Sequence, residues 1–427
     1  MIDINLIRDS PDLVRDNIKK KFQDAKLPLV DKIKKKDGEW RTLKTGTDSL
    51  RFQRNEVSKK ISEAKKNKDA KKEKTLMKEA KLIPDKITEV ETKMSKLQEE
   101  ISQLLSQIPN IISKHTPKGK DASQNKETEK IGKIPKFNFE IKNHAELGEK
   151  LNLLDFDSSA KSSGNGFYYM KGDLALLNQA LIRYGIDIMV KHGFTYMETP
   201  LMLRKDIIKN VTDLNDMKNQ IYKMESEDLY LIGTSEHSMI GRFIDTIIPE
   251  SKLPIKNTSY SMCFRKEIGS HGIDEKGLYR THQFNKVEMI VICKPDQSEK
   301  FFEELKDITI EIFKGLGIPI RILEICSGDL GDLKHRQVDI EAWSPRKEEY
   351  FEVGSCSNLT EAQARKLKIR SIKGNGEKFV PRTLNNTAIA TSRALVAILE
   401  NYQQKDGTVK IPDILLPYMH GKKFLGK

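Results

Sequence analysis

Residues 259–293 read SYSMCFRKEIGSHGIDEKGLYRTHQFNKVEMIVIC, and this stretch decides the fold. Two runs rich in β-forming residues flank a polar segment, expected at 268–279, that contains three glycines. The pattern predicts an antiparallel hairpin with a long loop. Because side chains alternate between the two faces of a strand, Arg265 and Glu267 are expected to share a face of the first strand.

The second run of this hairpin places four functional side chains on one face. They are His282, Phe284, Lys286 and Glu288. An arginine can hold a phosphate, an aromatic ring can stack on a base, and a glutamate can accept from an amine or an ammonium group. The hairpin therefore indicates a nucleotide site. A solvent-facing hairpin with cross-strand ion pairs is the alternative.

The N-terminal quarter of the chain is predicted to form a helical hairpin. A first run of apolar residues extends from Trp40 to Ala64, and a polar tip is expected at 65–69. Pro109 ends the second helix, and Pro84 is expected to kink it. The second run alternates steps of four and three, which is typical of a coiled coil: Leu76, Ala80, Ile83, Ile87, Val90, Met94, Leu97, Ile101, Leu104 and Ile108.

Basic charge is concentrated in this hairpin. The chain has a net charge of +13, and residues 1–110 carry 27 basic and 19 acidic side chains. Residues 57–81, around the tip, carry ten lysines and four acids. A basic excess of this kind suits a polyanionic partner such as a nucleic acid. A solvated lysine-rich surface or an oligomerisation coil is the alternative.

Composition sets the domain organisation and excludes several classes of protein. Residues 116–140 are rich in Lys, Pro, Gly and Ser and indicate a linker between a domain at 1–115 and a mixed α/β body at 141–427. No apolar stretch approaches the length of a membrane span. Four widely spaced cysteines argue against a disulfide scaffold and a structural zinc site. We therefore expect a cytoplasmic protein without zinc.

Several motifs resemble those of class II aminoacyl-tRNA synthetases, in the form found in seryl-tRNA synthetases. CFRKE, the glycine loop and HQFNKVE resemble motif 2, HGFTYMETP (192–200) resembles motif 1, and LNNTAIATSRALVAILENYQ (384–403) resembles motif 3. TSE at 234–236 resembles the serine-binding element, and EVGSCSN at 352–358 resembles the strand that binds metal and ATP. The segment LNNTAIATSRA is closer to archaeal and eukaryotic members than to bacterial ones.

The resemblance implies an α+β fold and a set of site residues. The fold is a mostly antiparallel sheet flanked by helices, with an N-terminal antiparallel coiled-coil arm. Arg265 and Arg393 are the implied catalytic residues, on the α- and γ-phosphates of ATP. The implied ATP-binding residues are Arg265, Lys266, Glu267, Thr281, Phe284, Glu352, Val353, Gly354, Ser355 and Arg393. The implied serine-binding residues are Thr234, Ser235, Glu236, Arg265, Glu288 and Thr387.

The resemblance also implies a cofactor and partners. Glu352 and Ser355 are the implied ligands of Mg²⁺, which prefers oxygen. The implied partners are ATP, L-serine, tRNA(Ser) and a second copy of the chain, and tRNA(Sec) is a further candidate substrate. Two other hypotheses stay open: a paralogue that adenylates an amino acid without charging tRNA, and a non-catalytic coiled-coil RNA-binding protein.

Four positions depart from the usual pattern of the family. Gly354 and Gly166 replace a serine and an arginine, Arg336 replaces a lysine, and Ser238 follows His237 where proline is common. None of these changes removes an expected phosphate, metal or serine contact.

Overall fold

The computed structural model describes residues 1–212, 219–267 and 277–426. The chain divides into two compact units, Met1–Pro109 and Asn110–Lys427. Most of the glycine-rich loop expected at 268–279 lies outside the described residues.

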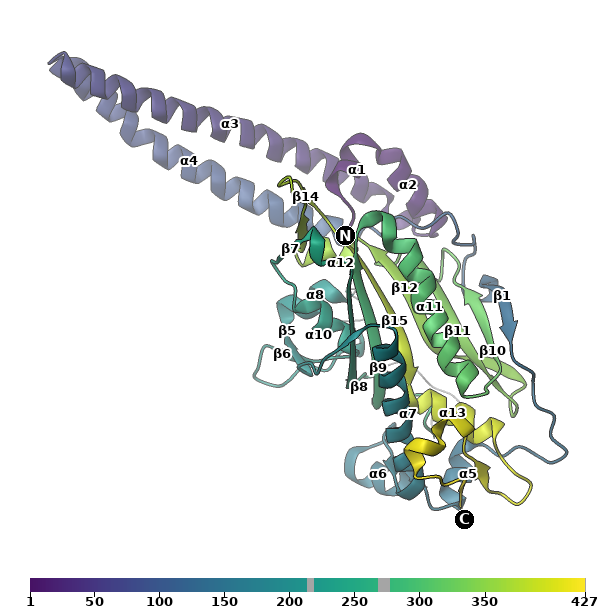
Figure 1. The fold of residues 1–427 in the computed structure, drawn as a ribbon. Coiled ribbons are helices and arrows are strands. Elements are labelled where there is room, and N and C mark those ends of the chain that lie inside the picture. Colours follow the sequence, from purple (N-terminus) through teal and green to yellow (C-terminus); the bar gives the residue numbers. More distant parts are fainter. Residues whose placement is uncertain (213–218, 268–276, 427) are drawn as a thin grey trace. The chain divides into compact units, whose positions relative to one another are not determined.

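Unit 1 confirms the predicted helical hairpin. The short helices α1 (Ile4–Asp9) and α2 (Pro11–Lys20) precede two long ones, α3 (Leu27–Lys66) and α4 (Ala70–Leu105) (Figure 1). The turn between them falls at the predicted polar tip, where Asp69 caps α4 by accepting from the backbone N–H of Lys72. Pro84 lies inside α4.

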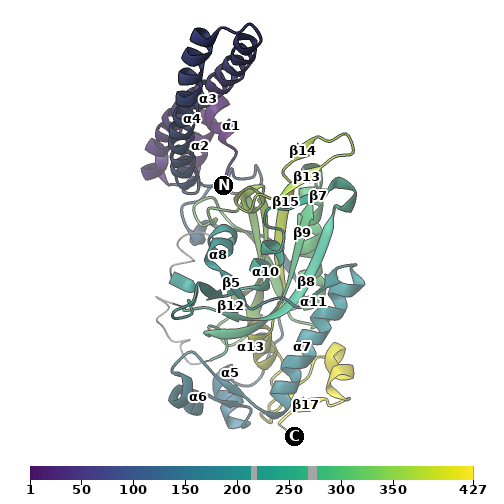
Figure 2. The same ribbon diagram turned by 90° about the vertical axis from the view of Figure 1, so that its left-hand side faces the viewer.

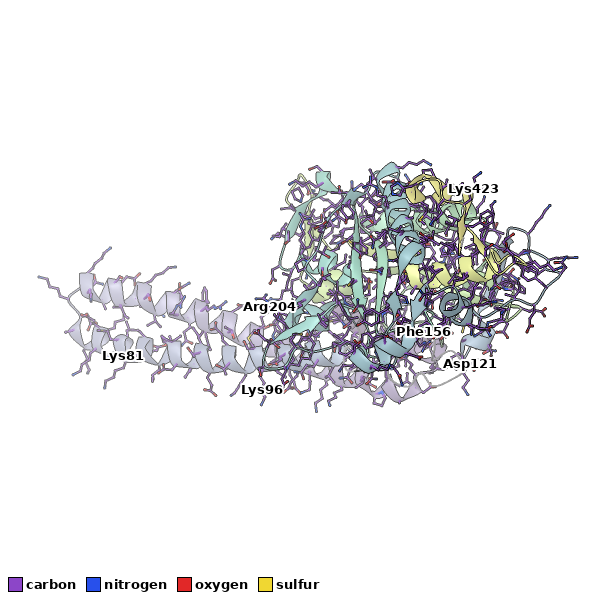
Figure 3. The ribbon with its side chains drawn as sticks, turned by 90° about the horizontal axis from the view of Figure 1, so that it is seen from below. Lys81, Lys96, Asp121, Phe156, Arg204 and Lys423 are labelled. Carbon is purple, nitrogen blue, oxygen red and sulfur yellow. The ribbon has the colours of Figure 1, made fainter. Side chains whose placement is uncertain are left out.

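A narrow apolar seam and ion pairs hold the hairpin together. Val57, Ile83 and Ile87 are buried between the helices near the tip. Arg51 reaches Glu91 across the hairpin at 2.7 Å. The side chains of many lysines, among them Lys81, project outward (Figure 3). In the outer part of the hairpin, residues 51–90, the basic side chains are exposed to solvent.

Unit 2 is built on an eight-stranded sheet, which confirms the predicted fold class. All neighbouring strands are antiparallel except β4 and β8, which are parallel. The strand order is β1 (Lys126–Ile131), β10 (Ile320–Glu324), β11 (Arg336–Ser344), β12 (Glu349–Thr360), β15 (Arg382–Ala390), β9 (Gln283–Cys293), β8 (Ile255–Phe264) and β4 (Thr195–Tyr196).

Helices cover the two faces of the sheet differently. The main core lies under the long helices α7 (Gly172–Lys191), α11 (Ser298–Gly315) and α13 (Thr391–Asn401). A smaller core lies on the opposite face, under α8 (Lys205–Val211), α10 (Ser235–Gly241) and α12 (Ala362–Lys366). Figure 2 shows α8 and α10 in front of the sheet. These shorter helices cover only part of that face.

Strand β9 shows how the alternation of side chains separates core from site. Val287 and Met289 point into the main core. Ile290 and Ile292 point into the smaller core on the other face. Lys286 and the other even-numbered residues before Ile290 share that second face, at the end of the strand that the short helices leave open.

The predicted hairpin is formed by β8 and β9, but its first strand is shorter than expected. Cys263 faces Phe284 in the ladder, and β8 ends at Phe264. The backbone N–H of Arg265 still donates to His282 (2.9 Å), whereas that of Lys266 turns to Gln220 (2.9 Å). Arg265 and Glu267 therefore follow the strand instead of lying on its face.

Residues 116–140, indicated as a linker by composition, are bonded to the sheet. They contain β1, which pairs with β10. The backbone N–H groups of Ser327 and Gly328 donate to Pro117 and Gly119 at 2.9 and 2.8 Å.

Short elements complete unit 2. They are α5 (His144–Lys150), α6 (Phe156–Ser163), β2 (Leu154–Asp155), β3 (Tyr169–Met170), β5 (Met202–Arg204), β6 (Leu229–Leu231), β7 (Ile247–Pro249), β13 (Arg370–Ile372), β14 (Lys378–Phe379), β16 (Val409–Lys410) and β17 (Phe424–Leu425). Within the described ranges, no helix combines the length and the apolar character needed to cross a membrane.

Candidate active site

A cavity of about 500 Å³ opens on the sheet face that the short helices leave uncovered. A smaller cavity adjoins it, because Arg265, Glu352 and Arg393 line both. Together they gather twelve of the side chains expected from the sequence: Thr234, Glu236, Arg265, Glu267, Thr281, Phe284, Glu288, Glu352, Val353, Ser355, Thr387 and Arg393.

Two guanidinium groups lie over aromatic rings in these cavities. The guanidinium carbon of Arg265 is 5.3 Å from the ring centre of Phe284. That of Arg393 is 4.9 Å from the ring centre of Tyr279. A cation over an aromatic face is attracted by the electron-rich ring. The cavity therefore offers both flat surfaces for a base and cations for phosphates.

Arg393 is positioned by the junction of β15 and α13. Its Nη1 lies 3.2 Å from Glu352 Oε2 and donates to the backbone oxygen of Glu352 at 2.9 Å. Burial disfavours the ionised form of Glu352, but the charge of the Arg393 guanidinium outweighs this and lowers the pKa of Glu352. Glu352 therefore stays a carboxylate, ready to accept a second cation.

A bulge in β12 brings two expected metal ligands to one face. Glu352 pairs with Glu341 and Gly354 pairs with Ile340, so Val353 is the extra residue. Side chains three apart normally point to opposite faces of a strand, but one inserted residue restores them to the same face. Glu352 and Ser355 accordingly both line the larger cavity.

Oxygen donors surround this bulge. Ser355 pairs in register with Asp339 on β11, and burial together with the charge of Glu352 raises the pKa of Asp339 to about 7. Carboxylate and hydroxyl oxygens are the ligands that Mg²⁺ prefers, and a nearby cation would favour the ionised form of each carboxyl. The donor set fits a magnesium ion completed by phosphate oxygens.

Glu236 lies at the floor of the cavity, in the first turn of α10. Thr234 caps that helix by accepting from the backbone N–H of Glu236. Glu236 Oε1 accepts from two neutral amides, Gln363 at 2.6 Å and Asn385 at 2.8 Å. Burial and the charge of Glu288 raise the pKa of Glu236 to about 7.

Glu288 differs from Glu236 because it already has a cationic partner. Its Oε2 lies 2.5 Å from Lys286 Nζ and 3.4 Å from Thr387 Oγ1. The two carboxyl groups thus stand in one cavity with different environments, one balanced by a lysine and the other held by amides.

Three other expected residues do not line these cavities. Ser235 is fully buried and donates to the backbone oxygen of Ser259. Lys266 lies 6.0 Å from the ring centre of Tyr222. Gly354 is buried on the core side of β12.

The departures from the family pattern have local structural reasons. A Cβ at Gly354 would lie 3.1 Å from Thr309 Cγ2, so glycine lets α11 approach β12 closely. A Cβ at Gly166 would lie 2.5 Å from the ring of His282. Arg336 donates to both oxygens of Glu324, at 2.9 and 3.0 Å, a fork that a lysine lacks. The hydroxyl of Ser238 donates to the backbone oxygen of Pro200 at 2.6 Å, a bond that a proline could not make.

Sequence reasoning missed several residues of the site. Tyr279 lines the smaller cavity from the expected loop between the two strands, where strand alternation gives no signal. Asn385 belongs to the motif 3 strand, where alternation with Thr387 was a usable signal. Gln363 follows the predicted metal strand by several residues, and no local pattern connects it with Glu236.

The comparisons with known proteins identify the family of the chain. Residues 1–112 match the family model of the seryl-tRNA synthetase N-terminal domain, and residues 221–402 match that of the class II core domain of the synthetases for G, H, P, S and T. A serine–tRNA ligase of Methanocella arvoryzae is 44% identical over the full length of both chains.

Two solved structures share the whole fold. A seryl-tRNA synthetase from Pyrococcus horikoshii complexed with ATP has a TM-score of 0.93 and 38% identity, covering 100% of this chain and 99% of that one. A cytoplasmic serine–tRNA ligase from Naegleria fowleri in complex with AMP has a TM-score of 0.87 and 32% identity, covering 100% and 98%. The chain therefore belongs to the seryl-tRNA synthetase family of class II aminoacyl-tRNA ligases.

Proposed function

We propose that this chain activates L-serine with ATP and transfers the seryl group to tRNA(Ser). In the first step a serine carboxylate oxygen attacks the α-phosphorus, and the bond to the leaving diphosphate breaks. In the second step a hydroxyl of the terminal ribose of tRNA attacks the seryl carbonyl, and AMP leaves. The convergence of Arg265, Arg393, Glu236 and Glu288 on one cavity supports this proposal most directly.

The side chains of the cavity supply positioning and charge. Arg265 would stabilise negative charge on the α-phosphate, and Arg393 would hold the γ-phosphate. Preorganised cations of this kind act where charge develops in the transition state. The attacking carboxylate is already ionised, so the first step needs no general base. Phe284 and Glu267 would hold the adenine by stacking and through its amine.

Glu236 and Glu288 divide the recognition of serine. The hydrogen-bond donors described for Glu236 are amides, so its charge suits the serine ammonium group. Glu288 has its charge balanced by Lys286, and with Thr387 it suits the hydroxyl. A site built to hydrogen-bond a hydroxyl rejects an analogue that lacks it, because its own polar groups are then left unpaired.

Mg²⁺ is the proposed cofactor. Glu352 and Ser355, which share a face because of the β12 bulge, would hold it together with ATP phosphates. When bound, such an ion neutralises charge on the diphosphate leaving group.

Unit 1 is the proposed tRNA-binding unit. Its match to the N-terminal family model and its basic side chains support this role. Charging of tRNA(Sec) stays a prediction, which a charging assay with that tRNA tests.

We also propose a homodimer that uses α7. Leu176 and Val190 are 52% and 53% exposed. They are fourteen residues apart, which is about four helical turns, so they lie near the same side of the helix. Light scattering of the purified chain tests this.

A cytoplasmic location is proposed because all four cysteines are free, and reducing conditions keep cysteines in that state.

The test of the proposed function couples two assays. Serine-dependent exchange between ATP and diphosphate measures the first step, and charging of tRNA(Ser) measures the second. The proposal predicts both. Exchange without charging would favour the paralogue, and RNA binding without exchange would favour the non-catalytic alternative.

A further inference from the structure

Gln363 stands behind the cavity and connects three elements around Glu236. It lies in α12, is 1% exposed and does not line the cavity. Its Nε2 donates to Glu236 Oε1 on α10 (2.6 Å) and to the backbone oxygen of Val211 at the end of α8 (3.2 Å). Its Oε1 accepts from Thr383 on β15 (2.9 Å).

These contacts fix the direction of the Gln363 amide. The backbone oxygen of Val211 can only accept a hydrogen bond, so the NH₂ group must face it. That orientation also aims an N–H at Glu236 and leaves the amide oxygen for the hydroxyl of Thr383. Every polar atom of the amide therefore has a partner, and rotating it would break the bonds to Val211 and Glu236, because a hydroxyl such as that of Thr383 can also accept.

A donor held in this way acts on the charge of Glu236 as well as on its position. A hydrogen bond to a carboxylate favours the ionised form, whereas burial favours the protonated form. Glu236 stands near the balance between these effects, since its pKa is raised to about 7. Near neutral pH, a small change in the donor therefore changes the fraction of enzyme that carries the negative charge.

Besides Gln363, Asn385 on β15 donates to Glu236 Oε1 at 2.8 Å, and the charged groups around Glu236 act on it through their charge. Glu288 on β9 raises the pKa of Glu236, while Lys286 on the same strand and Lys334 before β11 lower it by charge alone. Lys286 is bound to Glu288 at 2.5 Å. His237, the next residue on α10, is neutral.

We propose that Gln363 is a positioning residue for serine recognition, which orients Glu236 and keeps it in the ionised form that binds the serine ammonium group. This inference rests on the proposed function, in which Glu236 contacts serine. In this inference, a residue outside the cavity controls how serine binding depends on pH.

The test is the pH profile of kcat/KM for serine in the exchange assay, because that ratio reports the ionisation of groups in the free enzyme. In the unmodified chain it should rise as the pH passes through about 7, the value to which the pKa of Glu236 is raised. Gln363→Met keeps the approximate shape and removes the donor. It should move the rise to higher pH by about one unit and lower kcat/KM about fivefold at neutral pH, while KM for ATP stays within about twofold.

Two further variants make the result decisive. Gln363→Glu has nearly the same shape but places a second carboxyl against Glu236, so the rise should move at least as far. Arg365→Met is the matched control, since it changes a residue of the same helix whose partner is Glu361, just before the helix, and should leave the profile unchanged. A uniform loss at every pH in Gln363→Met, or an equal shift in the control, would mean that Gln363 only supports the fold.

The unmodified chain provides a check that does not depend on whether any variant folds. If the enzyme is active with serine but its kcat/KM does not change across about pH 6–8.5, the inference is overturned while the proposed function stands. If serine supports no exchange at any pH, the proposed function fails and the inference fails with it.

Discussion

Shortening the hairpin of unit 1 should separate the two steps of the reaction. Replacing residues 52–90 by a short glycine-rich turn removes the outer part of α3 and α4. The cut falls just beyond the cross-hairpin pair of Arg51 and Glu91, which are 2.7 Å apart and can close the new end. The pair of Lys36 and Glu100, at 2.5 Å, and the partly buried pair of Arg8 and Asp37, at 2.7 Å, remain at the base.

The size of the effect follows from the charge that is removed. Residues 52–90 carry eleven lysines and one arginine against seven acidic residues, a surplus of five positive charges. For each phosphate that the protein no longer neutralises, the slope of log K against log salt becomes shallower by about 0.7–0.9. If most of this surplus contacts tRNA, the slope should fall by about 2–4, and kcat/KM for tRNA should fall at least about 100-fold near physiological salt.

The first step should survive this change, because every residue that lines the two site cavities belongs to unit 2. Serine-dependent exchange should therefore stay within about twofold of the unmodified chain, since no charge near the transition state changes. A matched variant that keeps the length but changes lysines 71, 72 and 74 to glutamine separates charge from reach. Exchange and charging falling together would refute the reasoning, because the hairpin would then support folding of the catalytic unit.

Three substitutions test the site and its surroundings. Arg265→Met should lower the rate of exchange by about 10²–10³ without changing the unfolding midpoint, whereas the exposed Arg204→Met should have no effect; equal losses in both would contradict the role of Arg265. Gly354→Ser should cost about 1–3 kcal/mol in urea unfolding, because its Cβ meets Thr309 Cγ2 at 3.1 Å. Adding Thr309→Ser removes that methyl group and keeps the hydroxyl, so the double variant should recover most of the loss, and no recovery would place the strain elsewhere. Arg336→Met should cost about 3–5 kcal/mol because it leaves Glu324, 8% exposed, without its partner, and Arg336→Lys should cost less; an equal cost for both would show that the fork adds nothing.

Much of the architecture could be predicted from local patterns. The hairpin helices follow from the repeat of apolar residues, and their turn from the polar residues at 65–69. The side of β9 that bears Phe284, Lys286 and Glu288 follows from strand alternation. These features depend on neighbours in the sequence, so they can be read without the fold.

The remaining features depend on contacts between distant segments. The bulge at Val353, which puts Glu352 and Ser355 on one face, arises from the register with β11. The approach of Gln363 to Glu236 joins residues 127 positions apart. β1 is polar and reads as a linker because it is an edge strand paired on one side with β10. Such features come from tertiary pairing, which a single sequence does not display.

The most direct test of the central claim is ATP–diphosphate exchange measured with serine, threonine, cysteine and alanine in the presence of Mg²⁺. A cavity in which Glu288 and Thr387 hold a hydroxyl, and in which Glu236 holds the ammonium group, predicts that serine gives the highest kcat/KM. Alanine should fall behind by about 10⁴ or more, because it leaves the buried polar partners unpaired. Exchange with alanine or threonine that equals the exchange with serine, or no exchange with serine at all, would contradict the account.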